Sequence, residues 1–231
     1  MKHLILILTS LLLTSLSVKS QTYELGVFTG GSNFIGDVGS TKYIDPTSLA
    51  YGGIFKWNRS PRHSFRASFL KSNIKSSDHN SLDPRRKARN YNFTQNITEI
   101  STGIEFNFTD FDLHSYKSQF SFYLYSGLNF LTFEEYYLDP ILNTLKNNDS
   151  KNWALSIPIT IGLKTRLSHN LILGFEAGVR YAFTDALDGN KPKNKDINTN
   201  MFGNTNSNDW YTFTGLTLTY AFGKKPCFCN F

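Results

Sequence analysis

The feature that most constrains this chain is the way alternate residues separate into an apolar set and a polar set. In the segment from Leu171 to Phe183, the polar set contains Glu176 and Arg180. Successive side chains of a strand point to opposite faces, so this segment predicts a strand with one apolar face and one charged face. The apolar face consists of Leu171, Leu173, Phe175, Ala177, Val179, Tyr181 and Phe183.

The segment from Ile97 to Thr109 repeats this pattern, with Ile100 and Ile104 in one set and Glu99 and Glu105 in the other. In a soluble sandwich the polar face would meet bulk water, whereas in a membrane barrel it would line the interior. The N-terminus, the lengths of the connections and the positions of the aromatic residues distinguish these two interpretations.

The N-terminus predicts a secretory signal peptide over residues 1–20. Lys2 and His3 precede an apolar run from Leu4 to Leu16, and small residues follow at the usual cleavage spacing, so the mature chain would begin at Gln21. A retained anchor helix is the alternative. After Ser20 no segment approaches the roughly 20 apolar residues that a membrane helix requires, so insertion would need closed β-structure.

The composition agrees with such a barrel. Hydrophobic residues make up 40% of the chain and aromatic residues 15%, yet the mean hydropathy is −0.31. This mixture is expected when half of each strand faces a polar interior.

Candidate strands are separated by alternately long and short connections. The fold class predicted is an eight-stranded antiparallel transmembrane β-barrel over residues 21–222, with short periplasmic turns and long extracellular loops. The long connections are Ser32 to Leu49, Lys71 to Asn96, Glu134 to Trp153 and Thr184 to Asp209, and the short ones are Asn58 to His63, Asp110 to Gln119 and Ser168 to Asn170. The strands are expected at Tyr23 to Gly31, Ala50 to Trp57, Ser64 to Leu70, Ile97 to Thr109, Phe120 to Phe133, Ala154 to Arg166, Leu171 to Phe183 and Trp210 to Phe222.

Aromatic residues cluster at the ends of these strands, as in the girdles of membrane barrels. Their general preference for strands is the alternative explanation. Trp57, Phe65, Phe106, Phe108, Phe120, Tyr220 and Phe222 are expected near the periplasmic rim, and Phe130, Phe133, Tyr181, Phe183 and Trp210 near the outer rim.

The inward-facing series of the strands carries charges of both signs. An eight-stranded barrel is filled by its side chains, so these charges predict a paired plug, in which ion pairs offset much of their desolvation. A proton or ion path is the alternative function. The series contains Glu24, Lys56, Arg66, Glu99, Glu105, Lys164, Arg166, Glu176 and Arg180. Pro158 also falls within a strand, and because a closed barrel has no edge to host it we expect a bulge or break there.

The tail from Gly223 to Phe231 follows the last strand and carries both cysteines of the chain, Cys227 and Cys229. An even number of strands places this tail in the oxidising periplasm. A bond between two cysteines at this spacing is strained, so each is a candidate for a disulfide with another protein; a strained internal pair or free thiols are the alternatives. The tail is a candidate docking segment.

Charge and chemistry restrict the function further. Residues 85–89 contain Arg85, Arg86, Lys87 and Arg89 in a predicted external loop, where they would contact lipid phosphates or remain solvated. Nucleic acid is not an expected partner of a secreted chain. The histidines form no cluster for a metal and lie beside no nucleophile at the outer rim, so we expect no enzyme activity, no cofactor and no metal.

The chain contains three long, non-repetitive stretches: GGSNFIGDVG at residues 30–39, GGIFKWNRSPR at residues 52–62 and EISTGIEFNF at residues 99–108. These stretches resemble those of PorG, an outer-membrane barrel component of the type IX secretion system. The resemblance extends from about Tyr23 to the last strand. It implies a non-enzymatic subunit that associates at the periplasmic face with the ring built from PorK and PorN and helps cargo to reach the cell surface.

With that resemblance, the turn carrying Asn58, Arg59 and Arg62, the turn from Asp110 to Gln119 and the tail would face the ring. The Ser32 to Leu49 loop would lie outside the cell, where it either folds into the barrel mouth or contacts another translocon component. Two classes of function remain: an anchor for a periplasmic ring, and a self-contained barrel acting as a channel, adhesin or lipid enzyme.

Overall fold

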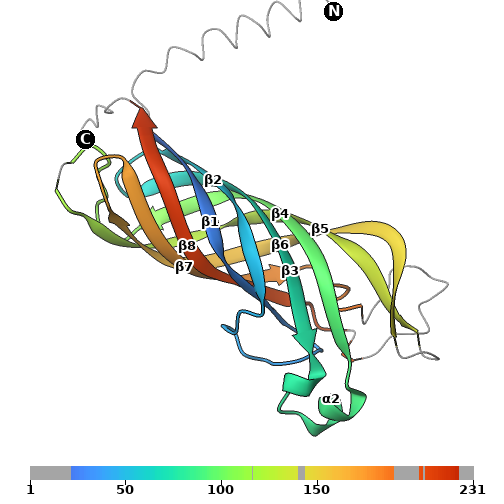
Figure 1. The fold of residues 1–231 in the computed structure, drawn as a ribbon. Helices are drawn as coiled ribbons and strands as arrows, with labels where there is room; N and C mark the ends of the chain where they lie inside the picture. Colours follow the sequence, from blue (N-terminus) through green and yellow to red (C-terminus); the bar gives the residue numbers. More distant parts are fainter. Residues whose placement is uncertain (1–21, 116, 140–143, 190–202, 205, 224–231) are drawn as a thin grey trace, which may run out of the picture.

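A computed structural model describes residues 22–115, 117–139, 144–189, 203–204 and 206–223. In these ranges the chain forms eight strands, a 3-10 turn η1 (Asp78–Asn80) and a short helix α2 (Pro84–Arg89) (Figure 1). The strands are β1 (Thr22–Ile35), β2 (Ser48–Asn58), β3 (His63–Ser77), β4 (Asn92–Asn107), β5 (Phe120–Asp139), β6 (Thr144–Arg166), β7 (Leu171–Ala182) and β8 (Trp210–Gly223). No helix in these ranges is long and apolar enough to cross a bilayer.

The strands close into a single antiparallel barrel in sequence order. Closure is made by β1 and β8, which pair from Thr22↔Gly223 to Ile35↔Trp210. The predicted eight-stranded barrel is therefore confirmed. The first residue of β1 and the last residue of β8 lie at the same end of the barrel as the short turns, and α2 lies at the opposite end (Figure 1). We call these the periplasmic end and the outer end, following the asymmetry of such barrels.

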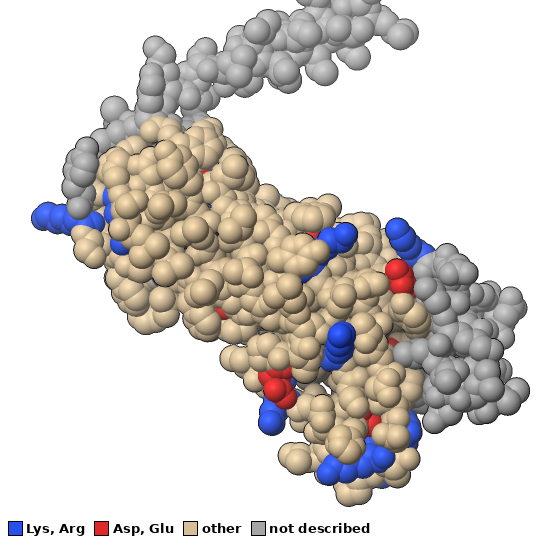
Figure 2. Space-filling view, in the orientation of Figure 1, with Lys and Arg blue, Asp and Glu red and all other residues tan. Residues whose placement is uncertain are grey.

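Alternation along each strand places apolar side chains outside and polar ones inside. On β3, Phe65 and Phe69 are each 48% exposed, whereas Arg66 is buried. Outward apolar residues on β5 extend from Phe120 to Phe130, which at ~3.3 Å per residue and a strand tilt of ~40° covers about 25 Å, the height of an outer-membrane apolar band. The middle of the barrel face in Figure 2 is nearly free of charge. The chain is an outer-membrane β-barrel.

Aromatic pairs lie near both ends of the barrel. Trp57 packs on Phe65 with ring centroids 5.4 Å apart near the periplasmic end. At the outer end, Tyr181 packs on Trp210 at 4.8 Å. These cross-strand contacts match the expected girdles, since aromatic rings favour the membrane interface. Phe133, expected near the outer rim with the girdle, is instead 2% exposed and packs in the interior cluster.

The strands at the outer end are longer than the sequence pattern predicted. The segment from Glu134 to Trp153, expected to be a loop, is instead largely strand, because β5 continues to Asp139 and β6 begins at Thr144. The alternation rule selects strands with one apolar face, and the sequence from Glu134 to Trp153 lacks that pattern.

Pro158 lies within β6, and of the predicted bulge or break the structure has the break. The register of β6 with β5 is the same on both sides of the proline, at Asn129↔Ser156 and Ser126↔Ile159. Ile157 and Pro158 do not pair with β5, although both pair with β7. The ladder is therefore broken locally without a shift, as expected for a residue that has no N–H to donate. The register shift between β5 and β6 occurs further along, between Glu134 and Tyr136.

Inward glycines make room for the large side chains of the interior. A Cβ at Gly162 would overlap the ring of Tyr123. Changing Gly162 to Val should displace that ring and destabilise the barrel by about 1–3 kcal/mol, because overpacking forces neighbours out of place. The outward Gly53 is a matched control, since its Cβ would meet only the Gly26 carbonyl oxygen at 3.9 Å. The measurement is the temperature at which the folded band converts to the unfolded one in heat-modifiable electrophoresis; equal shifts for both variants would contradict this packing.

Candidate functional site

Among the described residues, the strands place four cationic and four anionic side chains in the barrel interior, all of them buried. The cations are Lys56, Arg66, Lys164 and Arg180, and the anions are Glu24, Glu99, Glu105 and Glu176. We call these eight residues the lumen network. Their formal charges cancel, so the structure brings the predicted inward series together as a neutral plug. Arg166 belonged to that predicted series but has other partners, as described below.

Glu105 on β4 is the centre of one half of the network. Its carboxylate lies 2.7 Å from Lys56 Nζ and 2.8 Å from Lys164 Nζ. Arg66 Nη1 approaches the same carboxylate at 3.7 Å. One carboxylate therefore faces three cations, and its removal would leave them uncompensated.

Arg66 connects this half to Glu176 on β7. The guanidinium donates to the two carboxylate oxygens at 2.7 and 2.9 Å, the bidentate geometry that gives strong, directional pairing. Tyr123 Oη donates a further bond of 2.7 Å to Glu176. The guanidinium also lies over the ring of Tyr125, 4.6 Å from its centroid.

The other two carboxylates depend more on neutral donors. Glu99 Oε2 accepts a 2.7 Å bond from Tyr211 Oη and lies 3.6 Å from Arg180 Nε, beyond hydrogen-bond length. Glu24 accepts bonds from Thr219 Oγ1 at 2.7 Å and Asn58 Nδ2 at 3.1 Å. Each carboxylate thus has a donor, which is the condition for holding it away from water.

The periplasmic end is closed by the connection between β4 and β5. Phe111 and Leu113 turn inward and pack with Ile172 and Ala221. Arg166 holds this turn by donating to the carbonyl oxygens of Ser115 and, at 2.8 Å, Asp112. Arg166 is only half-buried and lies at the last residue of β6, at the periplasmic end of the interior. Its partners there are backbone carbonyl oxygens of the turn and not the carboxylates of the lumen network.

The turn between β2 and β3 leaves two arginines at the periplasmic surface. Arg59 is exposed and lies over the Trp57 ring, 5.5 Å from its centroid. Arg62 pairs with Asp110 at 2.5 Å, with both side chains more than half exposed. The side chain of Asn58 is instead engaged within the barrel. Its Nδ2 donates to Glu24, and its Oδ1 accepts a bond from Ser64 Oγ at 2.6 Å. Of the three predicted contact residues, Arg59 and Arg62 are thus available to a partner.

The outer end is closed by the loop between β1 and β2, which folds over the mouth. Val38 is fully buried there, and Gly39 adopts a φ of 80°, a left-handed conformation that favours glycine. Asp78 accepts the Gly39 N–H at 3.0 Å and the Arg89 guanidinium at 2.7 Å. The first alternative for the Ser32 to Leu49 loop, insertion into the mouth, is therefore the observed one.

We call the β1–β2 loop that covers the barrel mouth the outer cap. Two arginines of the basic segment at residues 85–89 hold it in place. Arg89 Nη2 donates to the Asp37 carbonyl oxygen at 2.7 Å, and Arg86 Nη1 donates to that of Gly39 at 3.1 Å. Arg85 and Lys87 are exposed, and contact of these two with lipid phosphate stays a prediction.

A buried carboxyl group lies under the cap. Asp209 Oδ2 accepts the Leu187 N–H at 2.9 Å, and the residue is 1% exposed. Burial raises the pKa of Asp209 well above its ordinary value, and the neighbouring Asp188, Asp185 and Asp37 carboxylates add to the rise.

Sequence reasoning missed the tyrosines of the network. Tyr123 and Tyr211 lie at inward positions of β5 and β8, and the same alternation that identified the charges would have included them. Cys227 and Cys229 lie outside the described residues, as does the predicted signal peptide. Among the described residues, no three His, Cys, Asp or Glu side chains are arranged to hold a metal ion.

The sequence matches, over residues 2–231, the family described as a domain of unknown function (DUF6089). No curated protein matches it. Similar solved structures include the N-terminal β-barrel domain of Pseudomonas aeruginosa OprF, with 13% identity, 88% of this chain and 98% of that chain covered, and a TM-score of 0.47. A major outer membrane protein from Thermus thermophilus has 12% identity, coverages of 88% and 100% and a TM-score of 0.45. The outer membrane protein OprG from Pseudomonas aeruginosa has 9% identity, coverages of 89% and 97% and a TM-score of 0.44.

Replacing Glu105 by Gln tests the lumen network. The change leaves Lys56, Lys164 and Arg66 without their shared carboxylate, and it should cost about 3–5 kcal/mol of unfolding free energy, as for other broken buried pairs. Asp110→Asn removes one partner of the exposed pair with Arg62 and should cost about 0–1 kcal/mol. Urea unfolding in lipid vesicles measures both, and equal costs would contradict a central role for Glu105.

Replacing Asp209 by Asn tests the cap. Because the folded pKa of Asp209 is raised, its contribution to stability is fully present below the unfolded pKa and is lost as pH rises through the folded pKa. The Asn variant should therefore resist proteolysis of the outer loops better than wild type at pH 8, with the difference disappearing in acid. Asp45→Asn in a neighbouring loop is the control; an Asp209 variant less resistant than wild type at pH 8 would contradict the assignment.

Proposed function

The chain belongs to the DUF6089 family, and we propose that it is a non-enzymatic outer-membrane subunit of a type IX secretion system. In this role it anchors a periplasmic ring of PorK/PorN-type proteins to the outer membrane. The observation that carries the proposal is the closed interior with its charge-balanced lumen network, which leaves the rims as the surfaces available for function. The choice of secretion system rests on the PorG-like stretches.

The PorG-like stretches include residues of the lumen network and residues exposed at the periplasmic surface. Residues 52–62 contain Lys56 of the lumen network and the exposed Arg59 and Arg62. Residues 99–108 contain Glu99 and Glu105. The resemblance therefore covers part of the barrel interior together with the basic turn at the periplasmic surface, where an anchor would meet its ring.

The basic turn favours an acidic partner. Arg59 lies against the ring of Trp57, and Arg62 forms an ion pair with the exposed Asp110. Guanidinium groups form bidentate bonds with carboxylates, and arginine is enriched at protein interfaces. We propose that an acidic surface of the ring binds this turn, and that Cys227 or Cys229 forms a disulfide with the ring.

A self-contained barrel fits the fold equally well, and one observation favours an adhesin among its forms. β5 and β6 continue beyond the apolar band, to Asp139 and from Thr144, so a hairpin extends outside the membrane. An adhesin would use this hairpin and the outer cap, and its function would not depend on the periplasmic rim.

Affinity capture of the tagged chain from cells, under non-reducing conditions, separates these functions. Ring proteins should be captured with the wild-type chain and lost when residues 224–231 are deleted. The double change Arg59→Glu with Arg62→Glu should weaken the capture at least severalfold. Lys42→Glu with Lys87→Glu gives the same charge change at the outer end and should have no effect.

Heat-modifiable migration shows whether each variant is still a folded barrel. Capture of the ring and secretion of cargo that survive both the tail deletion and the arginine changes, in folded protein, would contradict the anchor. Loss of cell adhesion with intact secretion in a variant lacking the β5–β6 hairpin tip would favour the adhesin.

A further inference from the structure

One row of cross-strand partners marks the outer edge of the apolar band. Phe69 pairs with Ile100, Ile100 with Phe130, and Phe130 with Leu155, across β3 to β6. All four are large apolar side chains between 42% and 56% exposed. Lipid tails therefore reach this row on this side of the barrel.

The next lipid-facing row, two residues closer to the outer end on each strand, has a different composition. Tyr51 pairs with Lys71, Lys71 with Thr98, Thr98 with Thr132, and Thr132 with Trp153. Tyr51 and Trp153 are more than half exposed at its two ends. Exposed Tyr and Trp side chains favour the headgroup level of a membrane, so Lys71 between them lies where headgroups lie.

A groove opens at this level because β4 and β5 separate. Their ladder ends at Ile97↔Phe133, and beyond it Gln95 Nε2 bridges to the Glu134 carbonyl oxygen at 2.8 Å. The groove has a volume of about 600 Å³, within the range of small-molecule sites. The short polar side chains Asn96, Thr98 and Thr132 are among the residues that line it.

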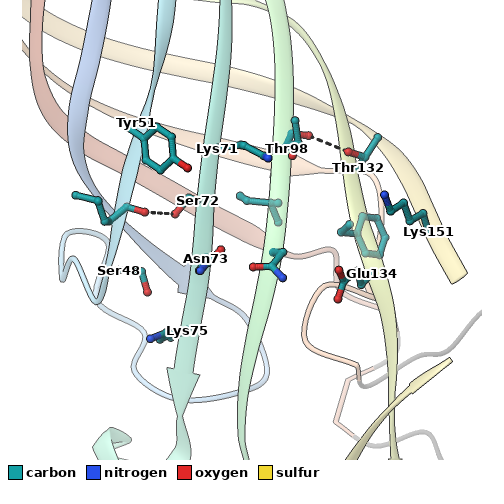
Figure 3. A pocket seen from close by; sticks show the side chains of 14 residues that line it. Ser48, Tyr51, Lys71, Ser72, Asn73, Lys75, Thr98, Thr132, Glu134 and Lys151 are labelled. Carbon is teal, nitrogen blue, oxygen red and sulfur yellow. Dashed lines mark hydrogen bonds between the residues drawn. The ribbon is translucent and has the colours of Figure 1, made fainter. Parts of the chain in front are cut away.

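Lysines stand on both sides of the groove. Figure 3 shows the ammonium ends of Lys71 and Lys151 turned toward each other, with Thr98 and Thr132 between them, and Lys75 further along β3. No described residue forms an ion pair or hydrogen bond with the ammonium group of any of these three lysines. Glu134, the acidic residue of the groove, accepts a 2.6 Å bond from Tyr136 Oη.

We propose that this groove binds the phosphate groups of a phosphorylated glycolipid of the outer leaflet. Three lysines and one carboxylate, Glu134, line the groove, and Glu134 is the cross-strand partner of Lys151. The resulting excess of positive charge directly above an apolar band matches a ligand whose phosphate adjoins its acyl chains. The hydroxyl and amide groups that line the groove can bond phosphate or sugar oxygens, and Lys binds phosphate as a point charge. This site is separate from the periplasmic rim and does not depend on the secretion role.

Native mass spectrometry of the purified mature chain tests the site, with diphosphoryl lipid A as the probe. Lys71→Gln with Lys151→Gln should lower the affinity for this lipid about tenfold or more, since each lysine near a membrane surface contributes appreciably to binding anionic lipid. The matched control is Lys42→Gln with Lys87→Gln, in which the same charge is removed from outer loops and the affinity should stay within about twofold of wild type. Binding should also weaken as salt is raised.

Two further probes identify the ligand group. Chemically dephosphorylated lipid A should bind like the lysine variant, and inorganic phosphate should not displace the intact lipid. Equal binding of the dephosphorylated lipid, unchanged binding by a folded lysine variant, or an equal loss in the control would overturn the proposal. Displacement by inorganic phosphate would overturn the lipid as occupant.

Discussion

Charge balance inside a narrow barrel is the constraint on which the rest of this structure depends. Eight strands enclose a space that side chains fill, so a charged group there cannot keep its hydration and must find a partner on a facing strand. Glu105 and Glu176 meet this condition through Lys56, Lys164 and Arg66. Glu99 has a tyrosine hydroxyl donor and lies near Arg180, and Glu24 is held by a hydroxyl and an amide donor. The network therefore joins strands from around the barrel into one packed unit.

The same interior explains where function can lie. Inward-folded segments cover the network at both ends, with Phe111 and Leu113 at the periplasmic end and Val38 at the outer end. The surfaces that remain are the basic periplasmic turn, the outer cap and the lipid-facing exterior. Each has a distinct chemistry, and the groove beside Lys71 shows that the exterior is more than a uniform apolar band.

The fold and the identity of most interior residues could be predicted from sequence, because alternation with a period of two assigns each strand residue to a face. The partners could not. Arg66 and Glu176 are 110 residues apart, and which inward residues meet across the lumen depends on the stagger of the strands, which alternation does not specify. Arg166 shows the limit of the rule, since its parity is that of the interior but its position at a strand end brings it to the turn instead.

Single-channel recording of the purified barrel in planar bilayers tests the central claim, that the interior is a closed and neutral plug. The wild-type chain should give no discrete openings over a range of voltages and salt concentrations. Glu105→Gln, which breaks the network, provides a comparison in which openings are expected if the protein still inserts. Steady, ion-selective openings of the wild-type chain would contradict the account and place its function in the lumen.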